Sequence, residues 1–588
     1  MAAINRGFGT GNPPDQNHIS TKQGMVMHMN RTKKFGFFGV VAYIVLACAS
    51  FVPAFLFDFT APALLSRTTG SILCVCLFAV LIAWCTFAKV KSRISIPQFA
   101  FYLSGGFVCI FSTYSLTFSG ENSPLLLIVV CLMWLVFAAA VMYERKMLNT
   151  SHIILIIAIA GFILRLGYIA YTAYNQRQHD VYDFGGGSGH SQYILYFFEN
   201  THLPDFDPRN IWQFYHPPLH HMIAGLWMRS LNLFGMDFAR IVENIQLLTL
   251  FYSSACMMIC YRIFTELGLH KGPLVLSFAL IAFNPSFIIF AGSINNDILS
   301  ITFMLGAILW TLRWYKARTM RNIIPIALCI GFGMMTKLSA ALVAPAIGLL
   351  FLLCFIIHFK KEWLTLIKQY VVFAVICVPL GLWWSVRCYV LFKVPFGYVP
   401  LIGEAADQFI GSYSVRDRLL DFRINDVFMA WGENRGGFFE HNPILGLLKT
   451  SLFGEFRLNE MSGCSELIFF FSTLLFYVNL VLVVLALIAM LSLVFRRKNT
   501  ADGPAKVFWI TLFVTVFGSY IRFCFSFPHT CTMNVRYAMP LIVTGIISLG
   551  VYMQRKQGKF QTAISLVAVI LIPVFSLFSS MVYILLAC

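Results

Sequence analysis

The chain has 588 residues, of which 59% are hydrophobic, 16% aromatic and only 12% charged, and its mean hydropathy is +0.77. Soluble domains carry roughly 25% charged residues, so this composition excludes a soluble globular protein, a disordered chain and a protein with a single membrane anchor. The net charge of +18 does not indicate nucleic-acid binding, because most Lys and Arg residues stand in short clusters between apolar runs, as in cytoplasmic loops of polytopic membrane proteins.

The chain begins with a polar and basic segment, 1–34, which we interpret as a cytoplasmic tail. A spanning helix needs about 20 apolar residues. Region 35–151 contains four such runs, at 35–57, 70–88, 98–118 and 124–143. Basic clusters follow the second and the fourth run, whereas the other connections are poor in positive charge. This alternation predicts a four-helix N-terminal membrane region whose N-terminus is cytoplasmic.

The next region, 152–392, is predicted to be a membrane core that includes the first long polar loop. A helix at 152–174 leads to this outer loop, 175–216. Residues 190–199 within the loop are expected to form a short amphipathic helix that lies in the membrane interface. A helix at 217–235 is then expected to cross back.

Charge clusters predict the direction of the next helices. Basic residues at 313–321 and 358–368 are expected to be cytoplasmic, so the helix that starts at Asp297 begins at the outer face. Segment 272–296 must then cross twice or re-enter, and Asn284-Pro285 breaks it in the middle. Such breaks are tolerated where the freed backbone is buried in protein or lines a cavity. The following apolar run, 322–336, is short, which places Lys337 within the bilayer thickness.

The remainder consists of a second large outer loop, 393–462, and a C-terminal region, 463–588, with four further apolar runs. The predicted fold is therefore an all-α polytopic membrane protein with roughly 15–17 transmembrane helices. We expect it in the plasma membrane.

Polar groups of catalytic type gather on the outer side of this map. They are Asp180, Asp183, His190, His216, Asp297, Lys337 and Arg536. Charged groups at membrane depth are costly unless they are paired or functional, so their convergence predicts a site. Arg165, deep in its helix, either snorkels or pairs with a carboxylate. No ligand spacing specifies a metal, and a divalent metal ion is left open.

Several short motifs follow one another in a characteristic order. They are His179-Asp180, Gly189-His190 with Tyr193, Tyr215-His216-Pro217-Pro218-Leu219, Asn295-Asn296-Asp297, Thr336-Lys337 and Arg536-Tyr537 with Pro540. Together they resemble the C-fold (GT-C) membrane glycosyltransferases, specifically the superfamily of protein O-mannosyltransferases and lipid A aminoarabinose transferases. The resemblance covers about 152–553, whereas the N-terminal helices look like an addition.

The resemblance implies an inverting transfer of a sugar from a polyprenyl-phosphate donor to a hydroxyl acceptor, at an extracytoplasmic site without a nucleotide fold. It assigns the general base to Asp180, with Asp183 in reserve. The donor phosphate and lipid would be held by Lys337, Arg536, Tyr537 and Arg165. Substrate contacts would come from His190, Tyr193, His216, Asp297 and Glu433. The sugar and the acceptor, whether protein, glycan or lipid, stay open.

Two alternatives compete with this interpretation. A transporter or flippase for a lipid-linked or polar substrate would use the broken segment 272–296 as its substrate site. A membrane scaffold without catalytic activity would need none of the acidic residues of the first outer loop. The enzyme hypothesis predicts that these acidic residues are dispensable for folding and essential for activity.

Overall fold

In a computed structural model of the chain, the described residues are 39–91, 93–118, 120, 123–431, 438–495, 503–555 and 558–588. The chain divides into two compact units, Met1–Ser50 and Phe51–Cys588. In the first unit, residues 39–50 are helical. Across the described residues the secondary structure is helical apart from an isolated bridge between Phe409 and His529. The predicted all-α class is confirmed.

Among the described residues, eleven helices are long and apolar enough to cross a membrane, and one bent helix pair passes the same test as a unit. The chain is therefore a multi-pass membrane protein. The expectation of 15–17 spans exceeds this number, and the difference lies in two shorter apolar helices, Met320–Thr336 and Met539–Gln554, and in one long helix that folds back on itself. These elements are described below.

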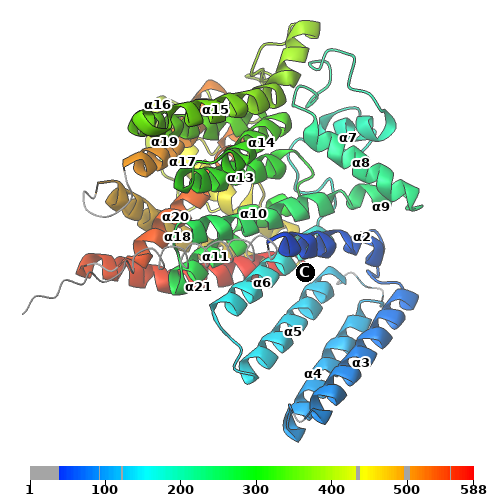
Figure 1. The fold of residues 1–588 in the computed structure, drawn as a ribbon. Coiled ribbons are helices and arrows are strands. Elements are labelled where there is room, and N and C mark those ends of the chain that lie inside the picture. The colour runs from blue at the N-terminus through cyan, green and yellow to red at the C-terminus, as the bar shows by residue number, and fades with distance from the viewer. Residues whose placement is uncertain are drawn as a thin grey trace, which may run out of the picture. The chain divides into compact units, whose positions relative to one another are not determined.

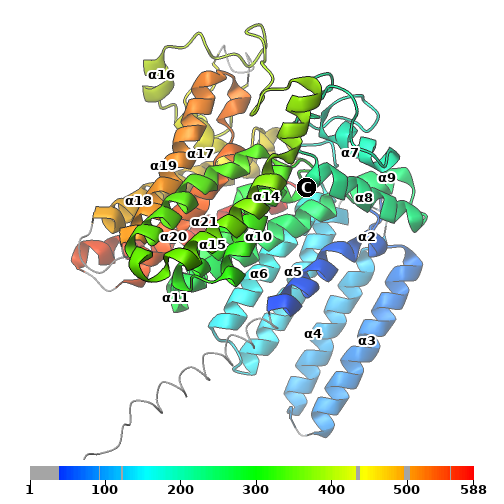
Figure 2. The same cartoon turned by 45° about the horizontal axis from the view of Figure 1, so that its top comes forward.

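The second unit begins with a short helix, α2 (Pro53–Leu56), and three long ones, α3 (Arg67–Val90), α4 (Ile96–Ser115) and α5 (Ser123–Glu144). Helices α3, α4 and α5 lie side by side (Figures 1 and 2). Helix α4 starts with a capping box, in which Ser95 and Gln98 satisfy each other's backbone N–H groups. Only 11% of the apolar window of α3 and 17% of that of α5 is buried, as expected of helices that face lipid.

The first outer loop follows α6 (Thr150–Ala170) and contains two helices, α7 (Gly189–Glu199) and α8 (Leu219–Leu233). Helix α7 matches the expected amphipathic segment. Helix α8 forms where a returning span was expected, but it has only 15 residues and is not among the candidate spans. The span is instead α10 (Gln246–Glu266), which continues from α9 (Phe238–Glu243). The expectation that 217–235 crosses the membrane is corrected accordingly.

This correction removes the need for 272–296 to cross twice. Helix α10 takes the chain across once, and α11 (Lys271–Ala282) and α12 (Pro285–Gly292) take it back as one broken span bent by about 40°. Asn284 caps α12 by accepting a hydrogen bond from the Ser286 N–H at 3.1 Å. Asp297 thus returns to the same end of the helices as the loop that carries Asp180.

Arg165 of α6 stabilises the break. Its guanidinium donates to the carbonyl oxygens of Ala282 at 2.7 Å and Ile281 at 3.3 Å, at the end of α11 where the helical hydrogen bonds stop. Gly161, one turn earlier, allows the close approach, because a Cβ there would lie 2.8 Å from the Ala282 oxygen. The side chain of Arg165 also donates to Ser253 at 3.0 Å.

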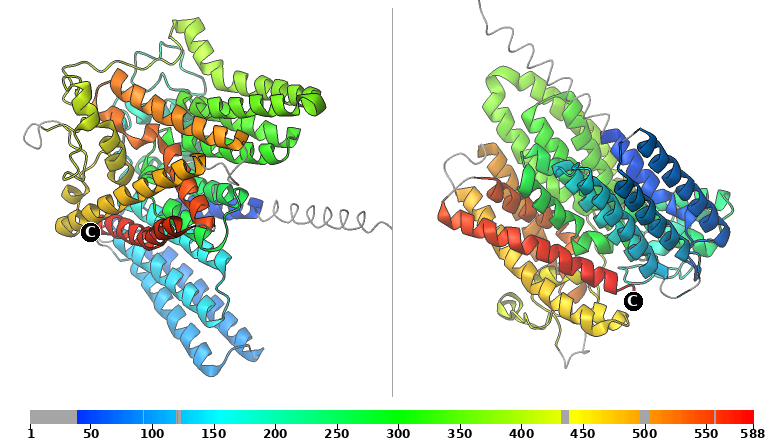
Figure 3. Two further views of the ribbon diagram at one scale, coloured as in Figure 1. Left: turned by 90° about the vertical axis from the view of Figure 1, so that its left-hand side faces the viewer. Right: turned by 90° about the horizontal axis from the view of Figure 1, so that it is seen from below.

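The next helices are α13 (Asp297–Lys316), α14 (Met320–Thr336), the 3₁₀ turn η1 (Leu338–Val343) and α15 (Ala344–Phe392). Helix α15 doubles back within its 49 residues. The hydroxyl of Tyr370 donates to the Phe351 carbonyl at 2.7 Å, and the two rings stack at 5.1 Å. In a straight helix these residues would be about 28 Å apart. The turn is visible in Figure 3, and it makes α15 the two spans expected at 339–357 and 369–392.

The second outer loop holds α16 (Val415–Leu420), α17 (Pro443–Phe453) and η2 (Leu458–Met461). The C-terminal part consists of α18 (Ser465–Phe495), α19 (Gly503–Ser526), η3 (Thr530–Met533), η4 (Val535–Tyr537), α20 (Met539–Gln554) and α21 (Lys559–Leu585). Helix α18 packs against α20 and α21, and α20 packs against α11 (Figures 1 and 3). The short connection between α19 and α20 is thereby held near the broken span.

Candidate active site

The site begins at Asp180, in the loop between α6 and α7. Its backbone is left-handed, with φ of 57°, which is uncommon for a residue other than glycine. The first turn of α7 holds it, since the His190 N–H donates to the Asp180 carbonyl at 2.9 Å. Gly189 makes this approach possible: its φ is 81°, and a Cβ there would lie 2.8 Å from the Asp180 oxygen. The carboxylate is consequently held at a fixed position.

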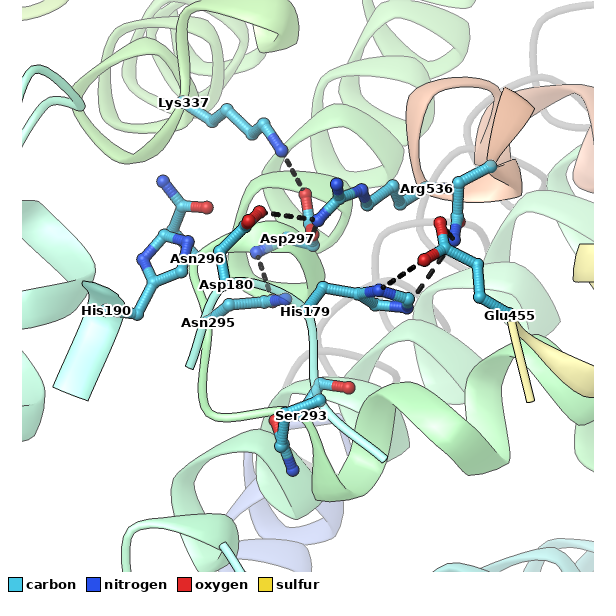
Figure 4. Close-up of polar contacts among 12 residues, drawn as sticks. His179, Asp180, His190, Ser293, Asn295, Asn296, Asp297, Lys337, Glu455 and Arg536 are labelled. Atoms are coloured by element: carbon cyan, nitrogen blue, oxygen red, sulfur yellow. Dashed lines mark hydrogen bonds and ion pairs between the residues drawn. The ribbon is translucent and has the colours of Figure 1, made fainter. Parts of the chain in front are cut away.

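Four charged side chains from distant parts of the sequence meet at this point (Figure 4). Arg536 of η4 places Nη1 3.3 Å from Asp180 Oδ2 and 3.9 Å from Asp297 Oδ2. Lys337 forms an ion pair with Asp297 Oδ1. Carboxylates and cations therefore alternate along the cluster. The Asp180 side chain is 33% exposed, whereas that of Asp297 is 2% exposed, so Asp180 is the carboxylate that a substrate reaches.

The turn before α13 positions the buried members of the cluster. Asn295 Oδ1 accepts a hydrogen bond from the Asp297 N–H at 3.1 Å. Asn296 donates to the Thr336 carbonyl at 2.9 Å, which ties this turn to the end of α14, directly before Lys337. The aromatic ring of Tyr537 completes the arrangement, with Lys337 Nζ 5.2 Å and Arg536 Cζ 4.9 Å from its centroid.

A cavity of about 350 Å³ opens over this cluster. The polar residues Asp180, His190, His216, Lys337 and Arg536 line one part of it. Another, mainly apolar part is lined by Leu338 and Leu342 of η1, by Tyr520 and Phe523 of α19, and by Phe527 directly after α19. The cavity therefore offers an anionic and a cationic surface beside an apolar one, as an amphiphilic ligand with a charged headgroup requires.

The surroundings keep the Asp180 carboxylate and the Arg536 guanidinium charged. Burial raises the pKa of the Asp180 carboxyl, but the charges of Arg536, His179 and Lys337 outweigh burial and bring it below the ordinary 3.8. Burial lowers the pKa of the Arg536 guanidinium, but Tyr537, Asp180 and Asp297 raise it well above its usual range. Arg536 Nε and Asp297 Oδ2 have no hydrogen-bond partner among the described residues. The site is thus a preformed charged centre.

Residues 215–384 match the family model described as dolichyl-phosphate-mannose-protein mannosyltransferase. The resemblance to the C-fold membrane glycosyltransferases is confirmed. The match supports membrane glycosyltransferase activity of the mannosyltransferase type. No curated protein matches the sequence significantly. The matched segment includes His216, Asp297 and Lys337, whereas Asp180 and Arg536 lie outside it and are joined to the glycosyltransferase segment by the fold.

Several residues that the sequence analysis expected to share one site are brought together by the structure. Asp180, His190, His216, Lys337, Arg536 and Tyr537 line the cavity, and Asp297 pairs with two of its cations. Tyr193 lies one layer behind, stacked on His221 at 4.2 Å, and its hydroxyl donates to the His216 carbonyl at 3.3 Å. Its role is to support the cavity wall.

Two histidines that line the cavity, His190 and His216, form a cluster with the buried His220 and His221. The rings of His190 and His221 stack at 5.2 Å, and His190 Nδ1 is 2.9 Å from His221 Nε2. Burial lowers the pKa of each imidazole, to about 4 for His220. The cluster is therefore neutral at physiological pH.

Two expected site residues stand apart from the cavity, and a third falls in a segment that the structure does not describe. Asp183 is exposed and accepts a hydrogen bond from Asn175 at 2.7 Å, so it is not placed to act as a reserve base. Arg165 is fully buried against the backbone of α11 and has a structural role in place of the donor contact expected of it. Glu433 lies outside the described residues.

The sequence did not single out two residues that adjoin the site, Glu455 and Asn534. Glu455 Oε2 lies 3.3 Å from His179 Nδ1, and Glu455 Oε1 accepts a hydrogen bond from Asn534 at 2.7 Å. In the sequence, nothing distinguishes Glu455 from the many other charged residues of the second outer loop. Asn534 stands two residues before Arg536, a spacing typical of a short turn, which was the available signal.

Among the residues that the structure describes, no three His, Cys, Asp or Glu side chains are arranged to hold a metal ion. The two acidic residues at the cavity are already paired with Arg536 and Lys337. The donor set therefore does not fit a divalent metal in this arrangement.

Proposed function

We propose that the chain is an inverting glycosyltransferase that moves a sugar from a polyprenyl phosphate to a hydroxyl acceptor at the extracytoplasmic face. The observation that carries the proposal is the accessible carboxylate of Asp180 beside Arg536 and Lys337 on one cavity. The description of the matching family refers to a dolichyl-phosphate-linked mannose, which is a lipid-linked sugar phosphate of this kind. The apolar wall between η1 and α19 suits the lipid part of such a donor.

In the proposed mechanism Asp180 acts as the general base. It removes the proton of the acceptor hydroxyl while that oxygen attacks the anomeric carbon from the side opposite the phosphate. The bond between the anomeric carbon and the phosphate oxygen breaks, and configuration inverts. A positioned base typically contributes 10²–10⁴-fold to the rate.

Arg536 and Lys337 stabilise the leaving group. The phosphodiester becomes a phosphate monoester and gains negative charge as the bond breaks. Cations held at that oxygen bind the transition state more strongly than the ground state, which lowers the barrier. Because Arg536 is paired with Asp180, a donor phosphate would compete for the guanidinium and release the carboxylate for proton transfer. Donor binding would then precede productive acceptor binding.

The direction of the helices supports an extracytoplasmic site. Helix α13 runs from Asp297 at the site to Arg313 and Lys316 at its other end, where both pair with Glu266. Basic clusters mark the cytoplasmic side in polytopic proteins. The site would therefore lie on the opposite side, in the plasma membrane, with 35–151 as an additional membrane region and 152–392 as the catalytic core.

The test uses purified protein, a panel of radiolabelled polyprenyl-phosphate sugars and a membrane extract as acceptor source. Asp180→Asn should lower transfer by about 10²–10⁴-fold with unchanged thermal stability. Asp183→Asn is the matched control, because it makes the same change three residues away at an exposed carboxylate outside the cavity, and it should retain activity.

Equal transfer by the wild type and Asp180→Asn would contradict the proposed base. Movement of label across vesicles without formation of a new glycosidic bond would favour a transporter.

A further inference from the structure

Two loops carry the charged groups of the site, and they are far apart in the sequence. One contains His179 and Asp180, and the other contains Asn534 and Arg536. The alignment of Asp180 with Arg536 depends on how these loops are held against each other. The proposed chemistry requires that alignment, since the base and the leaving-group cation must address the same sugar from opposite sides.

A single side chain, Glu455, contacts both loops (Figure 4). It follows Gly454, which ends α17 with φ of 61° and turns the chain towards the site. The Glu455 side chain is 6% exposed and that of His179 is 4% exposed. Phe456 adds a ring contact with His179, at 5.5 Å between centroids. The carboxylate therefore makes its contacts in surroundings from which water is largely excluded.

Both oxygens of Glu455 act as acceptors. Oε1 accepts from Asn534 Nδ2 at 2.7 Å, and Oε2 lies 3.3 Å from His179 Nδ1. Asn534 Nδ2 also approaches His179 Nε2 at 3.5 Å, an arrangement that leaves Nδ1 as the donor to Glu455. The side-chain oxygen of Asn534 in turn accepts from the Arg536 N–H at 2.9 Å. A continuous set of contacts thus joins the residue before Asp180 to the backbone of Arg536.

Helix α17 supplies a rigid base for this bridge. Thr450 Oγ1 accepts a hydrogen bond from the Val535 N–H at 2.9 Å. Gly446 lies so close to the turn before Arg536 that a Cβ there would be 2.7 Å from Met533 Cβ. Helix α17 also carries Lys449, which is fully buried and paired with Glu440. The second outer loop therefore packs directly beneath the turn that presents Arg536.

We infer that Glu455 is a positioning residue that holds the Asp180 loop and the Arg536 loop in register for transfer. It does not contact the cavity and acts through His179 and Asn534. The catalytic role of Glu455 rests on the proposed function. The contacts by which Glu455 joins the two loops can be tested independently of that function.

The test exploits the two acceptor oxygens. Glu455→Gln leaves one acceptor and one donor, so one of the two contacts is lost. Asn534→Asp places a second carboxylate against Glu455 and repels it. In the double variant, the amide introduced at position 455 donates to the carboxylate introduced at position 534, and the amide oxygen accepts from His179. The two contacts of position 455 and the net charge are thereby restored, and the introduced carboxylate still accepts from the Arg536 N–H, whereas the longer contact from position 534 to His179 Nε2 is not restored.

Each single variant should lower kcat by about 10–100-fold, as expected for a misplacement of about 1 Å, while the KM for the donor changes little. The double variant should recover kcat to within about fivefold of the wild type, which corresponds to a strong coupling between adjacent sites. Glu460→Gln is the control in the same loop, because its side chain is 56% exposed and pairs only locally with Arg457. It should leave kcat unchanged.

Thermal unfolding of the wild type, the two single variants and the double variant separates the two proposals. Recovery of the melting temperature in the double variant would support the bridge even if the wild type transferred no sugar, an outcome that would overturn the proposed function alone. Additive losses of kcat and of melting temperature in the double variant would overturn the bridge, whatever the activity of the wild type. Single variants with unchanged kcat would overturn the positioning role.

Discussion

Helices α3 and α13 are both apolar enough to cross a membrane, yet only 11% of the apolar window of α3 is buried, against 72% for α13. The N-terminal helices α3, α4 and α5 keep their charged side chains at helix ends. There Glu144 accepts hydrogen bonds from Gln98 and Tyr102, and Arg145 donates to the Tyr102 hydroxyl at 3.1 Å.

The core helices place charges inside the protein instead. Arg165 is fully buried in α6, and Asp297 is 2% exposed at the start of α13. Such groups are tolerated only with specific partners, because an unpaired charge away from water is costly. Helices that all pass as membrane spans therefore serve two different roles: lipid-facing helices with few buried residues, and core helices whose buried charges have defined partners. The following predictions test this difference.

After Asp180→Asn, the largest loss of transfer activity is expected from substitution of Arg536. Arg536→Gln removes the guanidinium from the leaving-group position and should lower transfer by about 10²–10³-fold, the usual cost of losing one stabilising donor. Steady-state transfer of a radiolabelled lipid-linked sugar measures it. Arg536→Lys keeps the charge and should retain more activity than Arg536→Gln. Equal activity of the two variants would show that charge at this position is irrelevant to catalysis.

How much of the structure could be predicted from the sequence differs between the N-terminal helices and the core helices. Helices α3, α4 and α5 were located within a few residues, since apolar run length determines them. The prediction that Asp180, Lys337 and Arg536 lie on the same side of the membrane helices followed from the alternation of basic loops, and the structure brings the three residues to one cavity. Helix α8 was mistaken for a span although its 15 residues include the polar His220, His221 and Arg229. Counting this extra crossing then made the broken segment appear to need two.

The partners of buried polar residues could not be predicted. Arg165 was assigned to the donor phosphate because position alone does not reveal its contacts with the carbonyl groups of Ile281 and Ala282. Glu455 was one acidic residue among many in a long loop. Hydrophobic periodicity reports which face of a helix is buried, but it carries no information on which distant side chain meets it.

The second prediction concerns stability of the core. Arg165→Lys keeps the charge but cannot reach Ser253 and both carbonyl groups at once, so at least one buried acceptor loses its partner. An unsatisfied buried group costs about 1–3 kcal/mol. The melting temperature in detergent should therefore fall. Lys89→Arg, a reciprocal exchange on the exposed end of α3, is the control, and a comparable fall in both variants would contradict the assigned role of Arg165.

The third prediction is a pH dependence confined to the core, since α3, α4 and α5 contain no histidine. Burial holds the pKa of His190, His216 and His221 well below the ordinary 6.5. Below that pH the unfolded chain binds protons that the folded protein does not. The contribution of these histidines to stability should therefore be constant above about pH 6.5 and fall as the pH decreases, by up to about 1.4 kcal/mol per pH unit for each histidine.

The measurement is the difference in melting temperature between about pH 7.5 and pH 5.5. His221→Gln should reduce this difference, whereas His202→Gln, at an exposed histidine of the same outer loop, should not. The same pH dependence in both variants would locate the titrating groups elsewhere.

The smallest effect is expected at the end of the N-terminal helices. Glu144→Gln preserves the size of the side chain and still leaves an oxygen to accept from Tyr102, so transfer should remain within about twofold of the wild type, as for surface changes remote from a site. Activity assays alongside melting curves measure this. A loss of activity as large as that of Arg536→Gln would mean that the N-terminal helices take part in catalysis. The N-terminal helices and the core helices would then differ in burial but not in their importance for function.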